Sequence, residues 1–310
     1  MEFVELIISI IIFIFGLAIG SFLNVIVYRL EHNEKLNGRS YCPHCRHTLT
    51  WLDLFPVVSF LFLQGRCRYC SKKISMQYPL LETATGLIFI LIFNQSTQIF
   101  NLSALVLNSL DLLFIFYISS VLIIIFLYDL KHYIIPDQIL FPAIIISFMY
   151  RFLNSFHMKS SELIVGLANV KFEILTLGNY IFAAIVASAF FLLIYLVSHG
   201  EWMGFGDVKL AILLGLMLGW PNILLAIFLA FFFGAIIGVG LIVLDLRAQA
   251  YLKRSTRLEF KDSSGKPLKS KLPLGLKSQI PFAPFLITGT FVAMFWGQQI
   301  MNWYLHFLII

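Results

Sequence analysis

The chain has 310 residues, of which 60% are apolar and only 12% charged, with a net charge of +6 and a mean hydropathy of +0.90. Soluble domains are about a quarter charged and under half apolar. This composition excludes a soluble globular protein and indicates an all-α polytopic membrane protein.

The apolar runs predict about eight transmembrane helices, since one span needs roughly 20 apolar residues. The first run, residues 6–28, follows Glu2 and Glu5 instead of a basic segment. A cleaved signal peptide carries a basic start and a shorter apolar core, so we expect an uncleaved first helix. The eight expected spans are 6–28, 83–100, 103–128, 138–150, 178–198, 208–220, 222–244 and 281–305.

The distribution of Lys and Arg predicts the orientation, because these residues stay on the cytoplasmic side of short loops. With the N-terminus outside, the inside segments are 29–79, 129–137, 199–209 and 245–280, and they hold 19 of the 22 basic residues. We therefore expect the positive charge to face anionic lipid, and we expect no nucleic-acid partner. The basic segment 245–280 is expected to be a flexible cytoplasmic loop.

The polar insert 29–79 contains all four cysteines of the chain, as CPHC at 42–45 and CRYC at 67–70. Two such pairs predict a closed, structural zinc site with four thiolate ligands: Cys42, Cys45, Cys67 and Cys70. Two disulfides are the alternative, but the reducing cytoplasm disfavours them. His44 and His47 could compete as ligands.

Two acidic residues are placed for catalysis, Asp207 in GFGD at the start of the short sixth span and Asp129 at the inner end of the third. An Asp at a helix start is often only a cap, and we assign that role to Asp137. Gly204 and Gly206, however, permit a close-packed backbone that a cap does not require, and acids at membrane depth are usually functional. Two neighbouring carboxylates share a proton and can activate water, as in aspartic proteolysis.

Two further stretches say little by their residue types alone. GSFLNVIVYRL, residues 20–30, combines small residues suited to helix packing with Arg29, which could be a positive-inside anchor. Glu82 is explained equally well as an interfacial carboxylate, and for Asp111, near the outer end of the third span, we prefer that interpretation.

The ordered set GSFLNVIVYRL, CPHC…CRYC, ISMQYPLLE, YDLKHYIIPD, GFGDVKL and IPFAPFL resembles the type IV prepilin peptidases, a family of GxGD-type intramembrane aspartyl proteases. The resemblance covers about residues 16–290. It implies removal of the leader of prepilins or pseudopilins on the cytoplasmic side of the bacterial inner membrane, by catalytic Asp129 and Asp207. It also implies N-methylation of the new N-terminal residue with S-adenosylmethionine, for which Gly20, Asn24, Arg29 and Glu82 are the candidates.

One departure from the family concerns methyl transfer: many relatives have Arg-Tyr-Pro where this chain has Gln77 before Tyr78 and Pro79. The expected division is a first helix (1–28), a zinc insert (29–79) and a protease core (80–310). A transporter that uses intramembrane carboxylates is the rival function, and a non-catalytic assembly factor is another. The residues do not distinguish pilus assembly from type II secretion or DNA uptake, and they do not give the oligomeric state.

Overall fold

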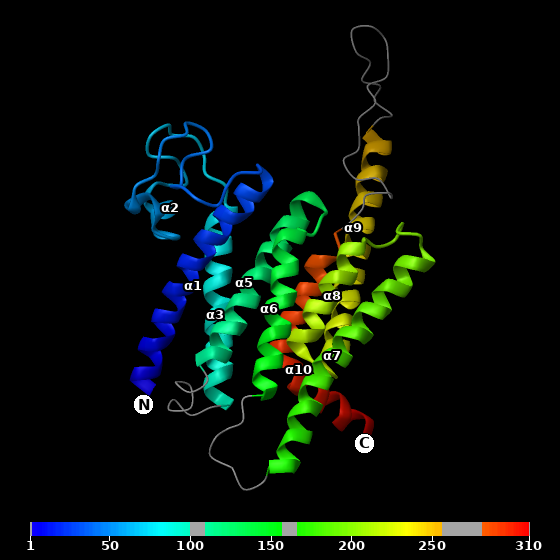
Figure 1. The fold of residues 1–310 in the computed structure, drawn as a ribbon. Coiled ribbons are helices and arrows are strands. Elements are labelled where there is room, and N and C mark those ends of the chain that lie inside the picture. Colours follow the sequence, from blue (N-terminus) through cyan, green and yellow to red (C-terminus); the bar gives the residue numbers. More distant parts are fainter. Residues whose placement is uncertain (1, 100–108, 157–165, 256–280, 310) are drawn as a thin grey trace.

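A computed structural model describes residues 2–99, 109–156, 166–255 and 281–309 (Figure 1). These residues form helices and connecting loops, and within them the only β-structure is two isolated bridges in the insert. The all-α prediction is therefore confirmed. The helices are α1 (Glu2–Glu31), η1 (Trp51–Leu54), α2 (Val58–Phe62), α3 (Gln77–Ile99), α5 (Ser109–His132), α6 (Asp137–Phe156), α7 (Gly166–Val197), α8 (Phe205–Leu218), α9 (Asn222–Ser255) and α10 (Ala283–Ile309).

Each predicted span coincides with a long helix, but the number of spans is only partly supported. Among the described residues five helices are long and apolar enough to cross a bilayer, namely α1, α5, α6, α7 and α9. Eight spans therefore stay a prediction, because α3, α8 and α10 are not among these five helices. Residues 245–255, expected as loop, instead continue α9. Residues 256–280 of that loop, and 100 and 103–108 of the second and third expected spans, lie outside the described residues.

The bundle has two parts that meet at α5. Helix α1 packs along α3, while α6, α7, α9 and α10 surround α8, and α5 contacts α1, α3, α6 and α10. The insert, the α5–α6 connection and the α7–α8 connection all lie at the same end of the bundle, called the insert end below (Figure 1). The N-terminus of α1 lies at the opposite end.

Small residues set the closest helix contacts. A Cβ atom on Gly20 of α1 would lie 2.7 Å from the Glu82 Cα of α3, and one on Gly16 would lie 2.7 Å from the Gly86 Cα. On the other side of the bundle, a Cβ atom on Gly215 of α8 would lie 2.3 Å from the Ala184 Cα of α7. Backbones this close leave no room for a larger side chain, as expected where apolar helices associate in lipid.

Helix α8 ends inside the bundle. Its 14 residues give a length of about 21 Å, well short of the roughly 30 Å of hydrocarbon. The last carbonyls of a helix lack intrahelical partners, and water cannot satisfy them at this depth. Arg151 of α6 supplies the partners, because its guanidinium donates to the carbonyls of Leu216 (3.1 Å) and Met217 (2.9 Å).

The side-chain amide of Asn179 completes this end of α8. It donates to the Trp220 carbonyl and accepts from the Trp220 N–H, each at 3.2 Å. The Arg151 guanidinium also stacks over the ring of Tyr180, 3.9 Å from its centroid. The far end of α8 is thus fixed by α6 and α7, which holds the helix and the acid at its start in one position.

Candidate active site and metal centre

Asp129 and Asp207 come from two helices that meet at the insert end. Asp129 lies in the last turn of α5, and Asp207 lies in the first turn of α8. Both are buried, with only 5% and 8% of their surfaces exposed. Because α5 ends where α8 begins, the fold brings together two acids that lie 78 positions apart in the chain.

The two carboxylates interact with each other electrostatically. Their other polar neighbours are backbone N–H groups, that of Ala283 for Asp129 and that of Gly204 for Asp207. Within the described part of the chain neither acid forms an ion pair. Two buried carboxylates without a cation between them do not both ionise easily, an arrangement that favours a shared proton.

The two glycines of GFGD have different surroundings. Gly204 is the N-cap of α8, and a Cβ atom there would lie 3.9 Å from the Asp207 Oδ2. Gly206 packs against the loop between α5 and α6, where a Cβ atom would lie 3.2 Å from the Ile135 side chain. Gly204 therefore places no side chain beside the Asp207 carboxylate, and Gly206 lets α8 approach the end of α5.

The other acids considered from the sequence lie apart from this pair. Asp137 begins α6, is half exposed, and binds the Lys209 ammonium through both oxygens at 2.8 Å. Asp111 lies at the opposite end of α5, where it accepts hydrogen bonds from Tyr150 and Asn154. Both acids are neutralised or hydrogen-bonded, so neither competes for the position facing Asp129 and Asp207.

The four cysteines form one cluster within the insert. Each pair lies in a tight turn closed by a bridge, Tyr41 with Thr48 for the first pair and Arg66 with Lys73 for the second. The turns match in detail, since the N–H groups of Cys42 and Cys67 donate to the carbonyls of His47 and Lys72. The spacing in the sequence predicted that the two cysteine pairs come together.

The sulfur positions fit a tetrahedral metal. The four thiols are free, and all four sulfurs lie within 4.8 Å of one another, with Cys42 and Cys70 at 3.9 Å. Zn–S bonds of about 2.3 Å in tetrahedral geometry place sulfurs about 3.8 Å apart. The cluster can therefore hold a metal ion. His44 and His47 are not part of it, and the His47 ring instead stacks on Tyr69.

A cavity of about 460 Å³ lies between the insert and the ends of α1 and α3. Its volume is in the range of small-molecule sites. Asn24, Arg29 and Glu82 line it, together with Gln77 and the aromatic rings of Tyr28 and Tyr78. Three of the four residues that the resemblance linked to methyl transfer thus surround one cavity.

Two of the methyl-transfer candidates, Arg29 and Glu82, bind backbone groups of the insert, whereas Gly20 serves helix packing. Arg29 is buried and donates to the carbonyls of Leu36, Gly38 and Arg39, so it holds the chain that leaves α1. Glu82 accepts the N–H of Val57 at 2.7 Å, which joins the insert to α3. Gly20 does not line the cavity and serves the contact of α1 with α3 described above.

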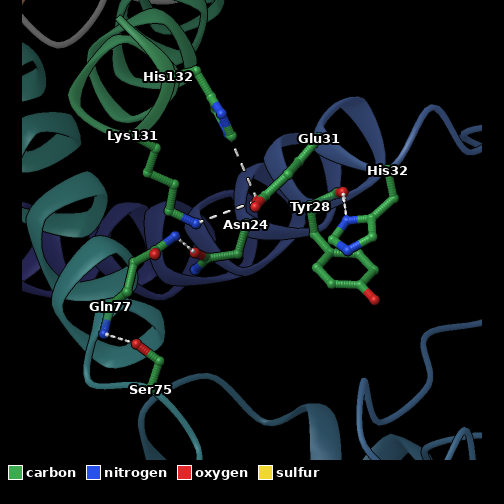
Figure 2. A network of polar contacts seen from close by, with 8 residues as sticks. All are labelled: Asn24, Tyr28, Glu31, His32, Ser75, Gln77, Lys131 and His132. Carbon is green, nitrogen blue, oxygen red and sulfur yellow. Dashed lines mark hydrogen bonds and ion pairs between the residues drawn. The ribbon is translucent and has the colours of Figure 1, made fainter.

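Asn24 and Gln77 face each other across the cavity wall (Figure 2). The Gln77 amide donates to the Asn24 Oδ1 at 3.3 Å, and the Asn24 amide donates to the Tyr78 carbonyl at 3.4 Å. The residue that departs from the family pattern is therefore in direct contact with one of the predicted candidates. An arginine at position 77 could also donate to the Asn24 Oδ1, but it would add a positive charge at the cavity wall.

Ion pairs link the cavity to the end of α5 that carries Asp129 (Figure 2). The Glu31 carboxylate lies 3.6 Å from the Lys131 Nζ and 3.8 Å from the His132 Nε2. Glu31 and Lys131 also line the cavity. Lys131 is two residues from Asp129, so the last turn of α5 both contributes to the cavity lining and carries one of the two acids.

Sequence reasoning missed Arg151, which is one of the three basic residues outside the predicted inside segments. It also treated the insert as uniformly polar, although residues 51–63 contain a single charge, Asp53. A hydropathy window as short as this segment, residues 51–63, would have identified it as apolar. Nothing in the sequence marks Arg151, because its partners are backbone carbonyls of another helix.

Comparison with known proteins places these features in a family. Residues 14–96 match the bacterial peptidase A24 N-terminal domain, and residues 116–239 match the type IV leader peptidase family. No solved structure matches the chain.

Curated relatives match over nearly the whole chain. The chain is 30% identical to a prepilin leader peptidase/N-methyltransferase of Aeromonas hydrophila, over 95% of this chain and 92% of the relative. It is also 30% identical to that of Pseudomonas aeruginosa, over 94% and 91%. Identity to that of Bacillus subtilis is 29%, over 95% and 97%.

Proposed function

We propose that this chain, which belongs to the type IV leader peptidase family, is a membrane-embedded aspartyl endopeptidase that removes the leader of type IV prepilins or pseudopilins and then N-methylates the new N-terminal residue. The observation that carries the proteolytic part is the meeting of two buried, unpaired carboxylates, Asp129 and Asp207, at one end of the bundle.

The acid pair can carry out hydrolysis without any other group. One carboxylate, ionised, removes a proton from a water molecule as the water oxygen attacks the scissile carbonyl carbon. The other, protonated, donates to the carbonyl oxygen and stabilises its developing charge. When the tetrahedral intermediate breaks down, the C–N bond is cleaved and the amine takes up the proton that came from water.

The position of the pair suits a helical substrate. Asp207 lies at the start of α8, at the end of the bundle where basic residues gather in the sequence. A prepilin is itself an apolar helix with a basic leader in the cytoplasm, so its scissile bond lies at the membrane boundary. The open backbone at Gly204 would let the substrate chain approach the Asp207 carboxylate.

The cavity between the insert and α1 and α3 is our candidate for methyl transfer. S-adenosylmethionine would supply a methyl group there to the new N-terminal amine. Asn24 and Glu82 offer polar atoms on the wall, and Tyr28 and Tyr78 offer aromatic surface. Gln77 orients Asn24 by its hydrogen bond, and Arg29 and Glu82 keep the insert in place over the cavity.

We assign a structural zinc ion to Cys42, Cys45, Cys67 and Cys70. A site closed by four thiolates leaves no open position for catalysis, so the metal would only join the two turns of the insert. Asp53 links the segment between the two cysteine turns to the second turn. Its carboxylate accepts hydrogen bonds from Thr50 and Tyr69 and pairs with Arg68 at 2.9 Å. Burial acts against ionisation of Asp53, but the hydrogen bonds and Arg68 outweigh it and hold its pKa below the usual range.

The charge distribution supports placement in the bacterial inner membrane with the N-terminus outside. The insert, both acids and the basic segments would then face the cytoplasm. The transporter alternative has no support in the geometry, since both acids lie at one end of the bundle instead of along a path through it.

Mass spectrometry of a co-expressed prepilin tests the proposal. Wild-type enzyme should yield a product that lacks the leader and carries one methyl group, and Asp207→Asn should leave the prepilin intact. Asp137→Asn is the matched control, an acid at the same end that pairs with Lys209, and it should cleave. Cleavage by Asp207→Asn at the wild-type level would refute the assignment. Cleavage without methylation by wild type would refute the second activity alone.

A further inference from the structure

The insert carries an apolar surface that no part of the described chain covers. Its residues belong to η1 and α2 and the turn between them: Trp51, Leu52, Phe55, Val58, Leu61 and Phe62. Three of them are largely exposed, with 69% of Trp51, 68% of Leu61 and 85% of Phe62 accessible. The opposite side of the same segment faces the cavity through Leu54, Phe60 and Leu63. The segment is therefore apolar on both sides.

Two tethers fix the height of this segment relative to the helices. Asp53 binds it to Arg68 and Tyr69 in the second cysteine turn. Glu82 accepts the Val57 N–H at 2.7 Å, and Glu82 is five residues inside α3, or about 8 Å along the helix from Gln77. The segment consequently does not sit above the bundle but reaches down beside it.

The neighbouring helix α1 gives a second measure of this depth. Glu82 lies against Gly20, which is eleven residues before the end of α1 at Glu31, or about 16 Å along the helix. Helix α1 is long and apolar enough to cross a bilayer. Val57 is therefore level with a part of α1 that belongs to its apolar, membrane-length stretch.

Exposed apolar side chains also occur on the two helices at this level. Phe22 of α1 and Leu80 of α3, both near the level of Glu82, are also exposed. Figure 1 shows α2 beside α1, on the side of the bundle away from α7, α8 and α9. No substrate that reaches Asp207 would cover this side, whereas the surrounding bilayer would.

We propose that residues 51–62 form a re-entrant anchor that inserts into the leaflet at the insert end, with Trp51, Leu61 and Phe62 among the lipid headgroups and upper acyl chains. A run of this length is too short to span and is typical of interfacial segments. Tryptophan is enriched at that depth. Arg66, Lys72 and Lys73 follow directly and are exposed, where they can bind anionic headgroups.

The anchor does not depend on the catalytic assignments, and fluorescence in liposomes tests it. The full-length, zinc-loaded protein is placed in vesicles of phosphatidylcholine and phosphatidylglycerol, with bromine at one of several acyl depths. The fluorescence emission of Trp51 is obtained by subtracting the spectrum of the Trp51→Phe variant from that of the wild type. Phe62→Trp on the Trp51→Phe background is a second reporter, in case the first substitution disturbs η1.

Both reporters should lose emission most strongly to bromine about 5–10 Å below the headgroups and should be protected from aqueous iodide. Lys35→Trp on the same background is the control, in the exposed loop after α1, and should show the reverse. Reporters quenched by iodide and not by bromine would overturn the proposal and leave a protein partner as the cover. Equal bromine quenching at position 35 would also overturn it, because the whole insert would then lie on the membrane.

Discussion

Replacement of Arg151 by methionine should destabilise the protein and slow leader cleavage, although Arg151 lies at the end of α8 opposite to Asp207. The guanidinium satisfies the carbonyls of Leu216 and Met217 at 3.1 and 2.9 Å. In Arg151→Met these two carbonyls lose their donors at a depth where water does not replace them.

The magnitude follows from these contacts. Each hydrogen bond from a charged donor contributes about 1.5–3 kcal/mol, and the stacking on Tyr180 adds about 0.5–2 kcal/mol. Removing a buried cation recovers part of this, because the guanidinium no longer has to be desolvated. We therefore expect the free energy of unfolding to fall by about 2–4 kcal/mol.

Unfolding in mixed micelles of a mild detergent and dodecyl sulfate measures this loss. Arg151→Lys keeps the charge but cannot reach both carbonyls with a planar fork, so its stability should be intermediate. Tyr180→Leu removes only the stacking partner and should cost at most about 2 kcal/mol. If Arg151→Met unfolds with wild-type stability, the carbonyls have other partners and the account of how α8 ends is wrong.

Three further substitutions test the insert and its contact with the helices. Cys67→Ser should reduce bound zinc, measured by elemental analysis, from one ion per chain to none. His44→Ala should keep its zinc, since His44 is outside the sulfur cluster. Equal zinc contents in the two variants would contradict the four-thiolate site. Gly20→Ala should lower the free energy of unfolding by about 1–3 kcal/mol, because the added methyl group overpacks against Glu82. Gly238→Ala meets no atom within 4 Å and should raise the free energy of unfolding by up to about 1 kcal/mol. The opposite order of stabilities would refute the close contact of α1 and α3. Glu82→Ala should lower methylation of the product at least about tenfold, or 1.4 kcal/mol, and should leave leader cleavage unchanged. Mass spectrometry of the product measures both reactions. If cleavage and methylation fall in parallel, Glu82 acts on the fold as a whole.

Long apolar runs predicted the helical architecture, while the orientation that the basic residues indicate stays a prediction. Each expected span coincides with a helix among the described residues, because in lipid only a helix pairs all backbone groups within one segment. The end of α9 was wrong, since residues 245–255 are polar but helical. A polar sequence does not end a helix unless a proline or glycine stops it.

The acid pair was predictable in kind but not in geometry. Charge bias placed Asp129 and Asp207 on one side of the membrane, and the fold then brought α5 and α8 together at that side. How closely the two helices approach depends on the contact of Gly206 with Ile135. Contacts between residues so far apart in the chain leave no trace in a single sequence.

Buried cations were the least predictable features. Arg29 was interpreted as an anchor or a methyl-transfer residue, yet it holds three backbone carbonyls of the loop after α1. Arg151 holds two carbonyls at the end of α8. Both bind main-chain groups, and any residue type can supply those, so the partner cannot be inferred from residue types.

Leader cleavage by purified enzyme in lipid, compared among Asp129→Asn, Asp207→Asn and the double variant, tests most directly whether the two acids are one catalytic unit. Residues that act as a unit are strongly non-additive, so each single variant should lose cleavage to the same background rate and the double variant should lose no more. Folding is verified by equal zinc content in all three. A single variant that keeps the wild-type rate, or losses that multiply in the double variant, would contradict the account.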